Sequence, residues 1–300
     1  MTQWRAMVSI VMLLGAYLWP GRLPAQAQQP DKPLPELNEF LKGVRAHLES
    51  DRLLLSQYTY NEKETERALD DKGKVKSTHE NIFEVYPSLE EGLTYRRLIS
   101  KDGKPLDKKV IEKQDREQDK KERDWTKKLE REGTDERARR LAKEAEEKRK
   151  EQEAIDELFQ LYRIELAGRE ILDGSPAIVL TFTPHSDYKP HTDEGKILAK
   201  VAGRAWICED DYQVIRVEAK LIDNISFGMG VLARLNKGAI ATFQRRRVNN
   251  EIWLPAEVRF TGNARVLLLK GLRLDVTSVY SDYTKFTVET QVKFRKDKNP

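Results

Sequence analysis

The sequence predicts an α+β fold: a curled antiparallel β-sheet, an unclosed barrel of about 10–11 strands, with an N-terminal amphipathic helix and a long charged helical hairpin insertion. Apolar and polar residues alternate over most of the chain, which indicates strands, and turns containing Gly, Asp or Asn indicate antiparallel pairing. An apolar stripe at helical spacing and a run of mixed charge indicate the helices. A sheet of this size has to curl, because its strands twist.

The first 27 residues are typical of a secretion signal. A short, positively charged start, Met1 to Arg5, precedes an apolar run from Ala6 to Trp19, which is shorter than the roughly twenty residues that span a bilayer. Ala25-Gln26-Ala27 then supplies the small-x-small pattern of a cleavage site. We therefore expect a signal peptide over 1–27 and one domain over 28–300, periplasmic and soluble after cleavage, with an uncleaved membrane anchor as the alternative.

The N-terminal helix is expected between Pro35 and about Ser50. Its apolar side chains recur at helical spacing: Leu37, Phe40, Leu41, Val44 and Leu48. This stripe is too narrow to be buried on all sides, so the helix should lie against the sheet. After it the period changes to two. A first strand is expected to begin with 57–60, a second to end with 82–86 after a turn at 70–73, and a third to cover 93–100.

A charged insertion at about 105–160 then interrupts the strands. Between Asp107 and Glu153, 33 of 47 residues are charged, 16 acidic and 17 basic, which favours helices with many pairs of opposite sign. Gly133-Thr134 should divide the run into two solvated helices, and local disorder or a partner-binding coiled coil is the alternative. Because the acidic residues cancel the basic ones, we expect no nucleic-acid partner.

The two-residue period returns after Tyr162 and continues to the end of the chain. The strands expected here cover 163–171, 177–182, 204–208, 214–222, 239–248, 252–260, 264–269 and 272–286. The concave face of the curled sheet is where the N-terminal helix should pack, and it is also the surface on which a ligand would be held.

Several stretches resemble an uncharacterised family of exported bacterial proteins, often labelled outer-membrane lipoprotein-sorting-like, and more broadly the LolA/LolB/RseB group of periplasmic lipoprotein-handling proteins. They are Tyr58-Thr59-Tyr60, Tyr95-Arg96-Arg97-Leu98, Gly168 to Gly174, Tyr188-Lys189-Pro190, Gly203 to Ile207 and Trp253-Leu254-Pro255. The resemblance implies an unclosed barrel, convex side solvated and interior plugged by helices, which in the carriers receives acyl chains. The charged insertion is longer than the carriers' lids, and none of their functional residues aligns here.

Catalytic chemistry has little support in the sequence. The loop His185 to Asp193 holds two His-x-Asp units that could ligate a metal, but no recognised zinc spacing and no Gly-x-Ser-x-Gly elbow is present. The single cysteine, Cys208, is expected as a small core residue beside Trp206. We therefore expect no enzyme, no catalytic or metal site and no cofactor, and a metal-dependent hydrolase that uses this loop remains a second alternative.

The apolar connection Asp223 to Leu235 is the best candidate for a functional element, because large apolar residues stand where a turn would ordinarily be polar. It is a flap over a cavity, a contact for a partner, or core that folds back on the sheet. The ligand-binding residues we expect are Tyr188, Trp206, Phe227, Met229, Leu232 and Trp253. The expected function is binding or chaperoning of lipoprotein acyl chains or other amphiphiles on the concave face, and the first alternative is a regulatory or assembly module that binds an envelope protein through the charged hairpin.

Overall fold

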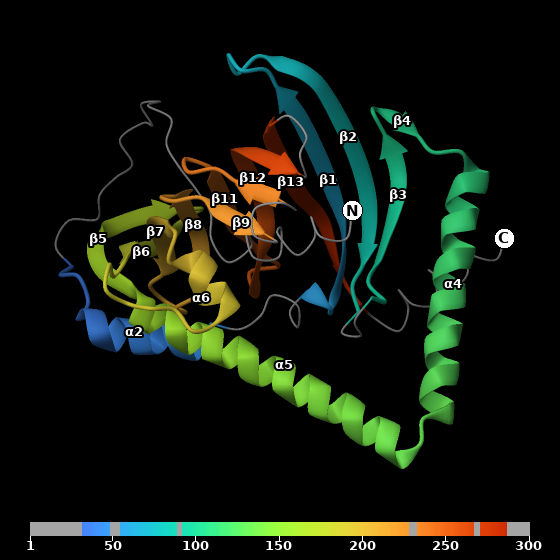
Figure 1. Cartoon of the computed structure of the whole chain (residues 1–300), viewed down its shortest axis with the longest axis horizontal. Helices are drawn as coiled ribbons and strands as arrows, with labels where there is room; N and C mark the ends of the chain where they lie inside the picture. The colour runs from blue at the N-terminus through green and yellow to red at the C-terminus, as the bar shows by residue number, and fades with distance from the viewer. Residues whose placement is uncertain (1–31, 49–54, 89–91, 228–232, 267–270, 287–300) are drawn as a thin grey trace. The chain divides into compact units, whose positions relative to one another are not determined.

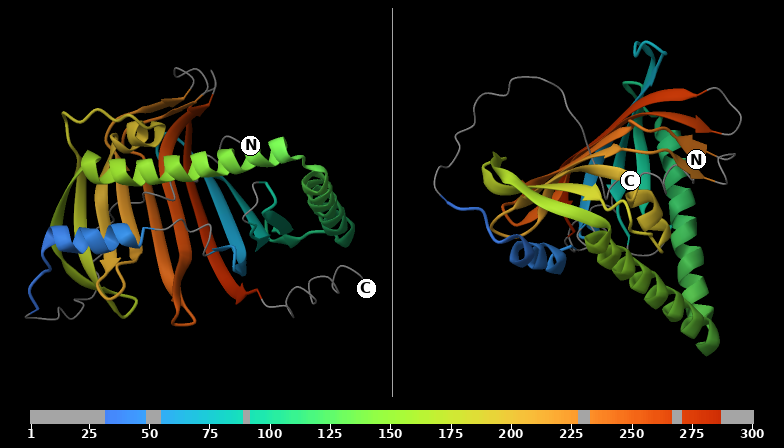
Figure 2. Two further views of the ribbon diagram at one scale, coloured as in Figure 1. Left: turned by 90° about the horizontal axis from the view of Figure 1, so that it is seen from below. Right: turned by 60° about the vertical axis from the view of Figure 1, so that its left-hand side comes forward.

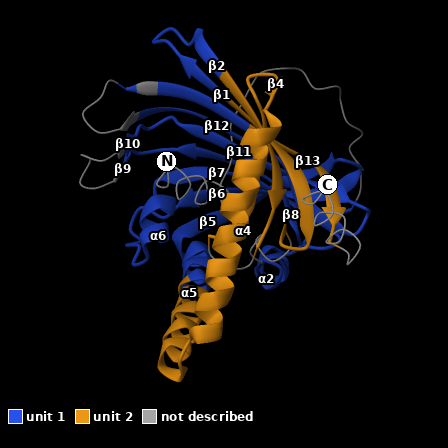
Figure 3. Ribbon diagram, turned by 90° about the vertical axis from the view of Figure 1, so that its right-hand side faces the viewer, with its two compact units in different colours: residues 1–49, 66–78, 151–277 blue, residues 50–65, 79–150, 278–300 orange. Residues whose placement is uncertain are grey.

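The computed structural model describes residues 32–48, 55–88, 92–227, 233–266 and 271–286. By their contacts these residues divide into two compact units, coloured separately in Figure 3. Unit 1 comprises residues 1–49, 66–78 and 151–277, and unit 2 comprises residues 50–65, 79–150 and 278–300. The expected signal peptide lies outside the described residues.

The described strands form one large, unclosed antiparallel sheet in the order β4-β3-β2-β1-β13-β12-β11-β8-β7-β6-β5, with β10 paired to β12 and β9 paired to β10 (Figure 1). This confirms the predicted antiparallel sheet. The strands of unit 2, three of which continue into unit 1, are β1 (Tyr58–Leu69), β2 (Val75–Tyr86), β3 (Tyr95–Lys101), β4 (Lys104–Pro105) and β13 (Leu272–Lys285). Those of unit 1 are β5 (Tyr162–Leu172), β6 (Ser175–Pro184), β7 (Val201–Cys208), β8 (Val214–Leu221), β9 (Ile225–Phe227), β10 (Ala233–Leu235), β11 (Ile240–Val248) and β12 (Ile252–Val266).

The strand count within the described chain is thirteen, against about 10–11 expected. The short strands β4, β9 and β10 were not anticipated, and the two strands expected over 252–260 and 264–269 are one strand, β12. Gly262 lies between the two expected strands, and it serves a close approach: a Cβ at this position would lie 2.7 Å from the Ala239 Cβ. Glycine is needed there because another chain segment is near, not because the chain reverses.

The helices are α2 (Leu37–Ala46), α4 (Lys108–Arg131), α5 (Thr134–Leu161) and α6 (Asp193–Leu198). The helix expected after Pro35 is α2, and the charged run forms α4 and α5. Gly133 separates these two helices, where Arg140 of α5 donates to both carboxylate oxygens of Glu132 at 2.9 Å. The short helix α6 begins at Asp193, the last residue of the loop His185 to Asp193, and was not anticipated.

The sheet of unit 1 is apolar on both faces. On one face, Phe40 and Val44 of α2 pack against Ile178, Leu180 and Ile207. The other face carries the cluster Ala177, Val179, Trp206, Cys208, Ile215 and Trp253. Successive side chains of a strand point to opposite faces, so the uninterrupted apolar run of β6 supplies both clusters. Figure 2 shows α2 and the last turns of α5 on the same face of β5–β8.

Helix α2 is fixed at both ends. Near its start, the Arg169 guanidinium donates to Glu209 at 2.7 Å and to the carbonyl oxygen of Lys32 at 2.6 Å. Near its end, Arg45 is 2.5 Å from Asp156. Between them Gly43 faces Tyr212 so closely that a Cβ would lie 2.6 Å from the ring. The helix is therefore a fixed part of this face.

Candidate functional site

Unit 1 contains an apolar cavity of about 60 Å³. Its walls come from α6 and from strands β7 to β12, and each of the residues that form them is apolar: Ile197, Val201, Ala219, Leu221, Ile225, Leu235, Ala239, Ile240, Ala241 and Phe260. On β7, the side chain of Val201 points to the same face of the sheet as those of Ala205 and Ile207, which pack with α2. The cavity therefore opens on the face of the sheet that α2 covers.

The cavity exists because small residues stand side by side in neighbouring strands. The antiparallel register places Gly203 opposite Ala219, Ala219 opposite Ala241, and Ala241 opposite Phe260. Directly opposed residues of an antiparallel pair share a face, so one glycine and two alanines adjoin there and leave space above the sheet. A Cβ on Gly203 would collide with the backbone of Glu218, so this glycine is also needed for β7 and β8 to pair.

The connection expected as a flap contains the β9–β10 hairpin, which borders the cavity. Ile225 pairs with Leu235, and both side chains line the cavity with 8% and 6% exposure. Leu235 also pairs with Ala264, so β10 continues the sheet beyond β12. Of the three expected flap residues, Phe227 ends β9, whereas Met229 and Leu232 lie outside the described residues.

A buried carboxylate, Glu157 in the last turns of α5, organises the segment before α6. Its oxygens accept hydrogen bonds from the backbone N–H groups of His191 at 2.7 Å and Thr192 at 3.1 Å, and from the Thr192 hydroxyl. The Tyr188 hydroxyl donates to it at 3.3 Å, and His191 Nδ1 lies 2.9 Å away. Burial raises the pKa of Glu157. The hydrogen bonds from Thr192 and His191 lower this pKa by more than burial raises it, so it lies below its ordinary value.

The loop His185 to Asp193, considered for a metal, is therefore arranged around Glu157. Its backbone, hydroxyl and imidazole groups satisfy this one carboxylate. Among the residues that the structure describes, no group of three or more His, Cys, Asp or Glu side chains is placed to hold a metal ion.

The expected ligand residues Trp206 and Trp253 lie apart from the cavity. Both belong to the cluster on the other face of the sheet and are 2% and 3% exposed. The Trp206 ring lies between the guanidinium groups of Arg204 and Arg216, at 4.8 and 4.9 Å, and its N–H donates to Glu170 at 2.8 Å. Their contacts are those of well-packed core tryptophans.

Sequence reasoning missed Glu157 and the small residues under the cavity. Glu157 stands one helical turn before the buried Leu161, so an acidic residue on the apolar stripe was the available signal. Gly203, Ala219 and Ala241 occupy inward positions of three strands, but only the strand register brings them together.

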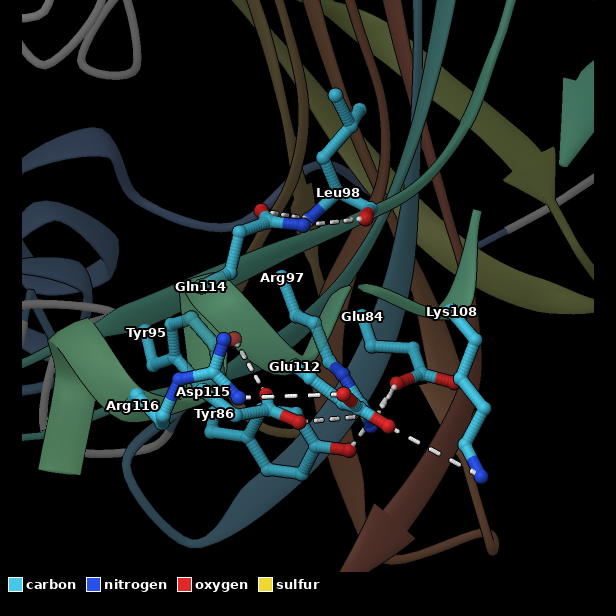
Figure 4. A network of polar contacts seen from close by, with 10 residues as sticks. All are labelled: Glu84, Tyr86, Tyr95, Arg97, Leu98, Lys108, Glu112, Gln114, Asp115 and Arg116. Atoms are coloured by element: carbon cyan, nitrogen blue, oxygen red, sulfur yellow. Dashed lines mark hydrogen bonds and ion pairs between the residues drawn. The ribbon is translucent and has the colours of Figure 1, made fainter. Parts of the chain in front are cut away.

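In unit 2, α4 is attached to β3 by polar contacts (Figure 4). Asp115 accepts hydrogen bonds from the Tyr95 hydroxyl at 2.6 Å and from Arg97 at 3.1 Å. The Gln114 amide exchanges two hydrogen bonds with the Leu98 backbone, at 3.1 and 3.0 Å. Asp115 and Gln118 are buried, so the first half of α4 packs against the sheet of unit 2. The sequence had instead suggested a helix that is solvated on all sides.

Comparison with solved structures recovers the resemblance expected from the sequence. A LolA superfamily protein from Nitrosomonas europaea is 9% identical, with 85% of this chain and 96% of that chain covered and a TM-score of 0.27. A domain described as an outer membrane lipoprotein-sorting protein from Vibrio parahaemolyticus is 11% identical, with 86% and 96% covered and a TM-score of 0.27. MucB of Pseudomonas aeruginosa, solved with MucA, is 9% identical, with 83% and 99% covered and a TM-score of 0.21.

Similarity at TM-scores this low does not indicate a function. The function is therefore inferred from the residues of this chain. No protein-family profile and no curated protein matches the sequence. Within the described part of the chain, none of the helices is long and apolar enough to cross a membrane.

Proposed function

We propose that the chain is an exported, periplasmic binding protein for amphiphiles such as lipoprotein acyl chains, with no catalytic role. The observation that carries the proposal is the cavity of unit 1, which is lined by apolar residues. Small residues on three neighbouring strands create this space, and a well-packed core would fill it. The proposal includes a curled sheet whose concave side, with α2 on it, faces the ligand.

The size of the cavity sets a condition on binding. A cavity of about 60 Å³ has room for only a few methylene groups, since one water molecule occupies about 30 Å³ of the liquid. Each methylene group that leaves water contributes about 0.8 kcal/mol. A longer acyl chain therefore has to displace a wall, and the β9–β10 hairpin is the element we propose to move, with Phe227, Met229 and Leu232 as its ligand contacts.

A cavity-filling substitution tests the site directly. Ala241→Leu adds a branched side chain to the cavity wall and should weaken binding of a fluorescent fatty acid about tenfold or more, since the leucine would occupy the space of two or three methylene groups. The unfolding midpoint should stay or rise, because filling a cavity usually stabilises a protein. Ala202→Leu is the matched control, since Ala202 neighbours Val201 on β7 and points to the other face.

The result that contradicts the proposal is equal affinity of the wild type and Ala241→Leu for the fatty acid, or no binding by either protein. Mass spectrometry of lipid extracted from the purified wild-type chain provides an independent measurement. Co-purified acyl chains that decrease in Ala241→Leu and persist in Ala202→Leu would support the cavity as the site.

A second function, binding of an envelope protein through the charged insertion, is favoured by one observation. Leu129 of α4 and Leu141 of α5 are 37% and 49% exposed on helices that are rich in charged residues. The contacts of Asp115 and Gln114 with β3 give α4 a fixed base. Crosslinking in the periplasm should yield an adduct that the double variant Leu129→Ser, Leu141→Ser loses, whereas Ala241→Leu keeps it.

A further inference from the structure

We infer that Glu157 is a positioning residue for the ligand cavity: its buried carboxylate fixes α6, and α6 supplies one wall. This inference rests on the proposed function, since it concerns how the same cavity is kept closed. Glu157 is 1% exposed, and its hydrogen-bond donors come from one short segment, Tyr188 to Thr192, which leads into α6.

The carboxylate acts on α6 through Thr192. The Thr192 hydroxyl donates to Glu157 and accepts the backbone N–H of Gly195 at 2.8 Å, so the residue that caps α6 is itself held by the carboxylate. Gly195 lies so close that a Cβ there would collide with the Glu157 carboxylate. The first turn of α6 therefore packs directly on Glu157.

The other end of α6 is held by the residue that follows α5. The buried Tyr162 hydroxyl donates to the carbonyl oxygen of Leu198 at 2.8 Å. Ile197, the residue of α6 that lines the cavity, lies between the two fixed ends. Glu157 and Tyr162 stand five residues apart in the chain, so the end of α5 and the start of β5 together determine where this cavity wall lies.

A buried carboxylate holds α6 in one position because it depends on a particular set of hydrogen-bond donors. An ionised group is costly to bury unless it is hydrogen-bonded, and removing it leaves its former donors unsatisfied. Loss of Glu157 would leave the N–H groups of His191 and Thr192 without their acceptor in a partly buried place, and they would regain one by turning toward water. The segment before α6 would then move outward and take Ile197 with it.

The test compares isosteric substitutions within this network. Glu157→Gln and Thr192→Val keep the side-chain shape and remove the charge or the hydroxyl, whereas Thr192→Ser keeps the hydroxyl and should behave as wild type. Glu170→Gln is the matched control, because Glu170 also accepts hydrogen bonds within unit 1, from Trp206 and Arg204, but on the other face of the sheet. Two quantities are measured below the unfolding temperature: hydrogen exchange of the backbone amides of 193–199, and the Kd of a fluorescent fatty acid.

We expect Glu157→Gln and Thr192→Val to accelerate exchange across 193–199 and to raise the Kd about tenfold. A tenfold change corresponds to about 1.4 kcal/mol, the contribution of one buried hydrogen bond. Thr192→Ser and Glu170→Gln should change neither quantity. Variants that exchange faster yet bind with the wild-type Kd would overturn the inference and leave Glu157 a purely structural residue. Absence of fatty-acid binding by the wild type would overturn the proposed function instead, and unchanged exchange in Glu157→Gln would refute the attachment of α6 by itself.

Discussion

At the scale of single residues, Glu157 links the pH of the medium to the stability of unit 1. Its hydrogen bonds hold its pKa below the ordinary value of 4.5 despite burial. A carboxylate whose pKa is depressed on folding stabilises the folded state above the unfolded pKa, and this contribution disappears as the pH falls through the folded pKa. The affected window therefore begins near pH 4.5 and extends to lower values.

The corresponding prediction concerns Glu157→Gln. The variant should be less stable than the wild type at pH 7, and the difference in the free energy of unfolding should shrink as the pH falls below about 4.5, because protonation removes the charge from the wild type as well. Urea denaturation of both proteins between pH 3 and pH 7 measures this difference. A difference that stays constant over the whole range would show that the charge of Glu157 contributes nothing.

Gly43 provides a second prediction at the residue scale, because two effects oppose each other there. Helix propensity alone favours Gly43→Ala by about 1 kcal/mol. The new Cβ would however lie 2.6 Å from the Tyr212 ring, and overpacking of this kind costs about 1–3 kcal/mol. We expect a net loss of stability by thermal denaturation. Gly133→Ala is the control, since no atom lies near its added Cβ, and it should be neutral or stabilising.

At the scale of elements, the β9–β10 hairpin is the part of the cavity wall that can move with least disruption. Among the described residues, β10 pairs with β12 through three residue pairs beyond its own pairing with β9, whereas β11 and β12 pair over nine. Local opening follows such differences in the number of interactions. The hairpin is therefore the element through which we expect a ligand to enter.

Substitution of Phe227 and Met229 by Ser tests this role of the hairpin. If these residues cover the ligand, the double variant should bind a fluorescent fatty acid roughly tenfold or more weakly, because a buried large side chain contributes about 1.5–3 kcal/mol. The melting temperature should hardly change. If they are core residues instead, stability should fall by about 2–5 kcal/mol per residue with affinity unaffected. Val75→Ser, on an exposed strand residue, controls for loss of apolar surface alone.

The charged insertion behaves as two parts. The sparse apolar residues of the charged run predict helices that the fold can lose, yet Gln114, Asp115 and Gln118 attach the first half of α4 to unit 2. Replacing residues 120–150 with a flexible linker should keep a cooperative unfolding transition. Replacing residues 107–153 should lower the midpoint further, because Tyr95 and Arg97 would lose the buried Asp115. Equal midpoints for the two variants would mean that the polar contacts of α4 add no stability.

At the scale of the whole molecule, the sequence predicts the class of fold and misses the site. Alternation reveals the strands because it depends only on neighbouring residues. The cavity depends on which strands lie side by side: Gly203, Ala219 and Ala241 are ordinary small residues until the register brings them together. Helix α6 could have been recognised, since Thr192 followed by Asp193 and Glu194 is a typical helix start, but its six residues are too few to show a period.

The last prediction concerns export of the whole chain. Cleavage after Ala27 would leave residues 28–31 ahead of Lys32, whose carbonyl oxygen Arg169 binds. We expect the exported chain to begin at Gln28 and to stay in solution after a high-salt wash of the membranes, as N-terminal sequencing and fractionation would show. A product that still begins at Met1, or that remains with the washed membrane, would instead identify residues 6–19 as an anchor.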